Sequence, residues 1–82
     1  MVKKYKKKPI VVEAIQWLGN NQHEVLKFIE NKGWFSLASG IIIKTPTGQL
    51  VADTSDYIIK GTQGEFYPCK PHIFKELYDE VK

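Results

Sequence analysis

The sequence predicts a small α+β domain: a mainly antiparallel β-sheet of about four or five strands, one packed helix and a carboxy-terminal helix or strand. Two observations lead to this class. Short segments rich in β-branched residues alternate with turns that contain Gly and Pro, which is typical of β-hairpins. One segment in the first half carries apolar residues at helical spacing instead. The 82 residues leave room for a single hydrophobic core.

Residues 10–17 predict the first strand, because the segment is rich in β-branched side chains and lacks helical spacing. Its apolar side chains fall on both faces: Val11, Ile15 and Trp17 on one, and Ile10, Val12 and Ala14 on the other. The strand is therefore expected to lie centrally in the sheet or to be covered on both sides.

Residues 21–32 predict a helix. Asn20 or Asn21 is expected to supply the N-cap oxygen, and Gly33 is expected to take the left-handed conformation of a C-cap. The apolar stripe of this helix consists of Val25, Leu26, Phe28 and Ile29.

Two hairpins are predicted at residues 41–52 and 57–69. Pro and Gly bracket the turn of the first, and the second turns at residues 61–64. Residues 34–37 predict either a short strand or a packed loop.

The tail, residues 71–81, has apolar side chains three and four apart, which predicts a helix with Pro71 in its first turn. An extended segment that ends in a short strand is the alternative. Trp17 and Phe66 are expected to pack in the core.

Charge divides the chain into a basic, flexible lead-in at residues 1–8 and a single domain at residues 9–82. The formal net charge is +3, and it becomes −2 without the five lysines of the lead-in, Lys3, Lys4, Lys6, Lys7 and Lys8. Positive charge on a nucleic-acid-binding domain is normally spread over a folded face, so these lysines are expected to form a solvated tail.

The single cysteine excludes an intramolecular disulfide and points to a reducing compartment. No apolar run is long enough to span a bilayer, so we expect a cytosolic protein without a membrane partner.

Residues capable of catalysis are scarce. The histidines are His23 and His72, and the cysteine is Cys69. Cys69 and His72 are three residues apart, which suggests a Cys–His dyad. We favour a structural role, with Cys69 as a small hydrophobic residue at a strand end and His72 at a helix start. Zinc would need more ligands than the chain offers. No catalytic residue, metal site or cofactor is therefore predicted.

Six residues of the second hairpin are candidates for ligand binding: Asp56, Tyr57, Lys60, Glu65, Tyr67 and Lys70. Asp56 and Glu65 either pair with Lys60, Lys70 or a helix terminus, which we favour, or accept hydrogen bonds from a base or a ribose of a ligand. The two tyrosines, with their polar hydroxyls, are suited equally to core packing and to lining a pocket or an interface.

Four blocks of the chain resemble a family of small bacteriophage and prophage proteins. They are Lys8–Trp17 (KPIVVEAIQW), Asp56–Gly61 (DYIIKG), Gly64–Pro71 (GEFYPCKP) and Ile73–Phe74, with Tyr78 downstream. Members of that family usually have Gly where this chain has Ser55. If that glycine serves a turn with positive φ, Ser55 is strained or the turn differs.

The resemblance implies a phage-borne accessory protein and provides no catalytic residue. We favour a protein that sequesters a small nucleotide signal of host immunity in the host cytoplasm, in a pocket between copies of a homo-oligomer. One alternative is an inhibitor that binds a host defence protein directly. The other is an accessory module that binds nucleic acid through the lysine tail.

Overall fold

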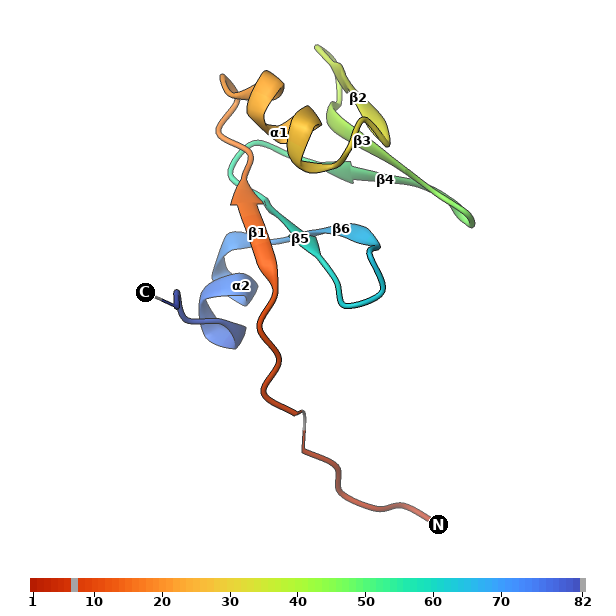
Figure 1. The fold of residues 1–82 in the computed structure, drawn as a ribbon, viewed down its shortest axis with the longest axis vertical. Helices are drawn as coiled ribbons and strands as arrows, with labels where there is room; N and C mark the ends of the chain where they lie inside the picture. The colour runs from red at the N-terminus through yellow and green to blue at the C-terminus, as the bar shows by residue number, and fades with distance from the viewer. Residues whose placement is uncertain (7, 82) are drawn as a thin grey trace.

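The computed structural model describes residues 1–6 and 8–81 and confirms the α+β class. Two helices and six strands follow one another along the described chain (Figure 1). In chain order they are β1 (Glu13–Gln16), α1 (Gln22–Phe28), β2 (Gly33–Ser36), β3 (Gly40–Thr45), β4 (Gly48–Ala52), β5 (Tyr57–Lys60), β6 (Phe66–Cys69) and α2 (Pro71–Leu77).

The strands form two antiparallel sheets rather than the single sheet of four or five strands that was predicted. Their orders are β1-β5-β6 and β2-β3-β4. Both predicted hairpins are present, as β3–β4 and β5–β6. Each hairpin gains its third strand from a different part of the chain, since β2 pairs with β3 and β1 pairs with β5. The segment that was predicted as a strand or a packed loop is therefore a strand, β2.

The core lies between the two sheets and α1. Its buried members are Trp17, Val25, Ile29, Ile41, Ile43, Ala52, Ile58 and Phe66. The predicted core positions of Trp17 and Phe66 are confirmed, with 1% and 4% of each residue exposed. Trp17 meets the ring of Phe35 edge-on at a centroid distance of 5.7 Å, which joins the two sheets across the core.

The first strand is shorter than predicted because β5, the strand with which it pairs, ends at Lys60. Glu13 pairs with Lys60, the last residue of β5, and the chain then turns at Gly61. Residues 10–12 extend past this point without a strand partner. They lie in the extended N-terminal segment that leads away from the sheet (Figure 1).

The first helix ends four residues earlier than predicted. Glu30 and Asn31, with φ of 57° and 59°, take the left-handed conformation that was assigned to Gly33. Gly33 belongs to β2, and it must be glycine because a Cβ there would collide with the Ile42 carbonyl oxygen. At the other end Asn21 occupies the N-cap position without capping, since its Oδ1 accepts from the Leu18 amide.

The tail is a helix, as predicted, although α2 ends at Leu77. Pro71 lies in its first turn. Tyr78 is extended, with φ −133° and ψ 142°, and residues 78–81 belong to neither a helix nor a strand. The helix lies against the sheet β1-β5-β6 on the side away from the sheet β2-β3-β4 (Figure 1). β1 lies at the edge of this sheet, and Ile10 and Val11 are 47% and 78% exposed, so the prediction that the first strand is central or covered on both sides is wrong over its predicted length.

The lead-in has neither helix nor strand among its described residues, and all of these are exposed. Lys7, one of the five predicted tail lysines, and Lys82, the end of the predicted domain, lie outside the described residues. In the described chain no helix has both the length and the apolar character needed to cross a bilayer.

Candidate functional site

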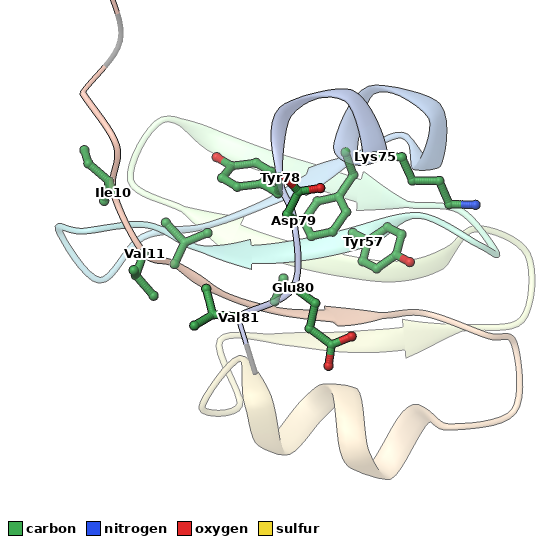
Figure 2. Close-up of a pocket in the computed structure, with 11 residues that line it drawn as sticks. Ile10, Val11, Tyr57, Lys75, Tyr78, Asp79, Glu80 and Val81 are labelled. Carbon is green, nitrogen blue, oxygen red and sulfur yellow. The ribbon is translucent and has the colours of Figure 1, made fainter.

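A cavity of about 550 Å³ lies where the N-terminal segment passes α2 and the residues that follow it (Figure 2). We call it the helix groove. It is lined by Ile10, Val11, Val12, Ala14, Tyr57, Phe74, Lys75, Tyr78, Asp79, Glu80 and Val81. Its volume falls within the range of about 300–1,000 Å³ that is typical of small-molecule sites. Segments from both ends of the chain form it.

Three aromatic rings line the groove. Tyr57 stacks on Phe74 with a centroid distance of 3.9 Å and an angle of 7° between the rings, and Tyr78 follows at 5.1 Å and 32°. Phe74 and Tyr78 lie one helical turn apart, and the Tyr78 amide donates to the Phe74 carbonyl. All three are only partly buried, so part of each aromatic side chain is open to solvent or to a ligand.

Charged side chains lie around these rings. Lys75 is the basic residue among the described lining residues, and Asp79 and Glu80 are the acidic ones. Figure 2 shows Ile10, Val11 and Val81 on one side of the rings and Lys75 on the other. The groove therefore offers aromatic, apolar, cationic and anionic contacts to one small molecule.

Two of the six predicted site residues, Asp56 and Lys70, are brought together as an ion pair. Lys70 Nζ lies 3.1 Å from Asp56 Oδ2 and 3.1 Å from Asp53 Oδ2. Asp56 is 3% exposed, and its Oδ2 also accepts the Asp53 amide at 2.9 Å. These hydrogen bonds, first with Asp53 and then with Asp56, raise the pKa of Lys70. The favoured pairing of Asp56 with a lysine is thus confirmed, and it fixes the connection between β4 and β5.

Lys60 and Glu65 lie at the other end of the β5–β6 hairpin, and neither lines the groove. Lys60 Nζ lies 3.1 Å from Glu30 Oε2, which lowers the pKa of Glu30. Glu65 Oε1 accepts the amide of Gln63 at 2.9 Å and so closes the hairpin turn. Both side chains therefore have partners within the protein.

The two predicted tyrosines lie on the face of the sheet that α2 covers. Tyr57 lines the groove, whereas Tyr67 lies beside Tyr78 below it. Burial, followed by the charge and hydrogen bond of Tyr78, raises the pKa of the Tyr67 hydroxyl. Of the six candidates, Tyr57 is the one that the structure places in the groove lining.

The remaining lining residues were not singled out from the sequence. Phe74 and Tyr78 carried a usable signal, since two aromatic residues four apart on a helix share one face. Residues 10–12 carried an apolar pattern that was assigned to a strand. No local pattern indicates that these two segments meet, because they stand more than sixty positions apart.

Cys69 and His72 occupy the predicted elements, at the end of β6 and the start of α2. Cys69 Sγ contacts the Lys70 carbonyl oxygen at 3.7 Å. In the part of the chain that the structure describes, no three His, Cys, Asp or Glu side chains are grouped in a way that could hold a metal ion.

Comparison with protein-family models, with curated proteins and with solved structures finds no match for this chain. The geometry of the groove and the pattern of the sequence are therefore the basis of a functional assignment.

Proposed function

We propose that this protein binds a small nucleotide in the helix groove and holds it without chemical change. The observation that carries the proposal is the lining of the groove, in which three aromatic side chains lie next to one lysine and two carboxylates within about 550 Å³. A nucleotide has one part that matches each of these contacts.

The base would pack against the aromatic side chains, which stack with any base through its π-face. Ribose hydroxyls and exocyclic amines donate hydrogen bonds, and Asp79 or Glu80 would accept them, as carboxylates do in other nucleotide sites. The phosphate would lie toward Lys75, away from the two carboxylates, because like charges repel.

The lysine tail supports the same proposal. It ends at Lys8, two residues before the lining residue Ile10, so its positive charge is tethered near the rim of the groove. Charge of this kind raises the local concentration of an anionic ligand and makes binding depend on salt.

The resemblance to bacteriophage accessory proteins supports a biological role for such binding. A phage protein that sequesters a nucleotide signal would silence host defence in the host cytoplasm without consuming the signal. In this proposal the protein forms a homo-oligomer whose second copy covers the open side of the groove, where Val11 and Val81 are 78% and 75% exposed.

A thermal-shift experiment with mono-, di- and cyclic nucleotides tests the proposal. A ligand that binds only the folded state raises Tm in a concentration-dependent way, and a domain of this size gains about 4–8 °C per kcal/mol. Lys75→Ala should reduce the shift, whereas Lys44→Ala, which removes the same charge from β3, should not. Chromatography of the released ligand should recover it unchanged.

Three results would contradict the proposal: no stabilisation by any nucleotide of the panel, stabilisation that Lys75→Ala leaves intact, or conversion of the nucleotide to a product. The first argues against the ligand class, the second against the groove, and the third against binding without chemistry.

A host protein is the second candidate ligand, and the exposed apolar side chains at the groove favour it. Ile10, Val11 and Val81 are 47%, 78% and 75% exposed, and Leu77 on α2 is 57% exposed. Exposed apolar side chains that form a contiguous patch often mark a protein interface. Recovery of one stoichiometric host protein by the tagged chain, lost on Val11→Asp, would support this candidate over the nucleotide.

A further inference from the structure

β1 is an edge strand, and the direction of its backbone groups shows which of them face outward. The order β1-β5-β6 leaves one side of β1 without a neighbouring strand. The Trp17 amide donates to the Asp56 carbonyl at 2.8 Å, and the Trp17 carbonyl accepts the Ser55 amide at 2.6 Å, so both groups point toward the β5 side. Backbone groups alternate in direction along an antiparallel strand, so those of Ala14 and Gln16 point away from β5.

The unpaired part of this edge is bounded at both ends. Asn21 Nδ2 donates to the Gln16 carbonyl at 3.0 Å and so occupies that outward acceptor. At the other end Pro9 has no amide to donate. Between them, residues 10–14 make no backbone hydrogen bond on the outer side within the part of the chain that the structure describes. We call these five residues the open edge, and Val12 lies at their centre.

The open edge is accessible and lacks the features that usually protect an edge strand. Ile10 and Val11 are 47% and 78% exposed, and Ala14 is exposed as well. Residues 79–81 line the helix groove beside this stretch, but among the described residues they make no backbone hydrogen bond to it. Edge strands are commonly blunted by Lys or Pro, and the open edge contains neither. An apolar edge of this kind is a template for pairing with another strand.

The partner that fits the open edge is a second copy of this chain. Turned end to end, the five residues present outward groups at the same spacing about Val12, as a closed two-fold contact requires. Charge sets the direction of pairing, because five lysines lie in residues 3–8 whereas residues 9–82 carry a formal charge of −2. Antiparallel pairing directs each basic lead-in along the body of the other copy, and parallel pairing would bring the two basic lead-ins together.

We propose that two copies pair antiparallel through their open edges, with Val12 opposite Val12 and Ile10 opposite Ala14. The two sheets then join into one of six strands, in the order β6-β5-β1-β1-β5-β6. Ile10 of the partner subunit lies beside Ala14 on the face that carries the helix groove, because directly opposed residues share a face. The partner thereby supplies part of the groove wall, since Ala14 is a lining residue. This role in the site rests on the proposed function, whereas the pairing itself needs no nucleotide.

Sedimentation equilibrium of the full chain without nucleotide tests the pairing, and a concentration-dependent dimer is expected. Val12→Pro removes the amide that both copies donate at the two-fold axis. It should raise the Kd of the dimer about 5- to 140-fold, the range that two net hydrogen bonds carry. Val11→Pro is the matched control, because the Val11 amide points to the β5 side and is not used in the pairing; this variant should leave Kd unchanged. Both positions precede β1, and circular dichroism should show both variants folded.

NMR spectroscopy of an equal mixture of ¹³C-labelled and unlabelled chain tests the register. In the proposed pairing, Val11 and Glu13 of the partner subunit form a non-hydrogen-bonded pair whose Cα atoms lie about 4.5 Å apart. An isotope-filtered experiment should therefore show an intermolecular contact between the Hα protons of Val11 and Glu13. A second contact is expected between the methyl groups of Ile10 and Ala14.

Three outcomes would overturn the proposal: a monomer at all concentrations up to those used for NMR, a dimer that both proline variants weaken equally, or intermolecular contacts between other residues. The same samples separate this proposal from the proposed function. A dimer that behaves as expected but gains no stability from any nucleotide supports the pairing and contradicts nucleotide binding. A monomer that a nucleotide stabilises has the reverse meaning.

Discussion

Ile58 and Ile59 are neighbours on β5 and are both buried, but they face different surroundings. Ile58 points into the main core, together with side chains from α1, β3 and β4. Ile59 points to the opposite face, because successive side chains of a strand alternate, and this is the face on which Tyr57 stacks against Phe74 of α2. This helix contains no buried residue of its own. We refer to the two sides as the core face and the helix face of the sheet β1-β5-β6.

The core face and the helix face differ in what they contribute: the core face stabilises the fold, and the helix face carries the candidate binding site. On the core face the apolar side chains form one continuous buried cluster that ties both sheets to α1. On the helix face the cover consists of half-buried aromatic rings beside a cavity of about 550 Å³. Regions with few buried contacts open more easily, and binding sites are often found there. The helix groove thus lies where packing is incomplete.

The largest expected effect is a difference between the two isoleucines. Ile58→Ala should lower the free energy of unfolding by about 4 kcal/mol and Ile59→Ala by about 2 kcal/mol, toward the two ends of the range for such truncations. The helix can settle onto the space left by Ile59, whereas the core around Ile58 is enclosed on all sides. Urea denaturation with a shared m-value measures both.

Because Ile58→Ala threatens folding in so small a domain, Ile58→Val and Ile59→Val form the safer pair. Their costs should keep the same order within about 0.5–1.5 kcal/mol. Equal costs in both pairs would show that α2 encloses its face as tightly as the core does, and the distinction between the faces would be wrong.

A smaller effect is expected at Ser55, just before β5. Its φ is 82°, in the left-handed region that side chains other than glycine adopt at a cost. The sequence left two alternatives open, a strained Ser55 or a different turn, and the positive φ corresponds to the first. Ser55→Gly should raise the free energy of unfolding by about 1 kcal/mol, the strain being only partly offset by the added chain entropy of glycine.

Ser39→Gly is the matched control, because Ser39 lies in an exposed turn and is not among the residues with positive φ. This change should be neutral or destabilising. If Ser55→Gly also destabilised the protein, the turn before β5 would not be strained, and the connection between the sheets would be more relaxed than its backbone angle indicates.

Local features of this chain could be predicted from its sequence. The hairpin at residues 41–52 follows from β-branched strands on either side of a Pro- and Gly-containing turn, and both hairpins form. Trp17 and Phe66 are core residues, as their size and position indicated. These features depend on interactions between residues close in sequence, which composition and spacing describe directly.

Features that depend on distant pairing could not be predicted. Residues 10–12 have the composition of a strand, yet they find no partner because β5 ends at Lys60. Lys60 and Lys70 each lie at the end of a strand, but Lys60 reaches Glu30 in the turn after α1, and Lys70 reaches Asp56. Apart from Tyr57, the lining of the candidate site was missed for the same reason, since the groove forms only where residues 10–14 meet α2.

The smallest expected effect concerns the charged edge of the core face. Lys60 lies on the same face as Ile58, and its Nζ is 3.1 Å from Glu30 Oε2. The hydrogen bond from Lys60 is the largest cause of the lowered pKa of Glu30, whose ordinary value is 4.5. A carboxylate with a lowered pKa in the folded state adds stability above its unfolded pKa and loses it as the pH falls through the folded value. The difference in free energy of unfolding between wild type and Glu30→Gln should therefore be constant near neutral pH and shrink below pH 4.5.

A double-mutant cycle tests whether Lys60 is the source of this pH dependence. In a Lys60→Met background, Glu30→Gln should show a much weaker change with pH, because the main source of the lowered pKa is gone and the more distant Lys32, at 3.7 Å, is left. Tryptophan fluorescence follows unfolding of the core in this titration, since Trp17 is a core residue. An undiminished pH dependence in the Lys60→Met background would show that the ion pair does not fasten α1 to the end of β5, and that the core face is held at this edge by apolar packing alone.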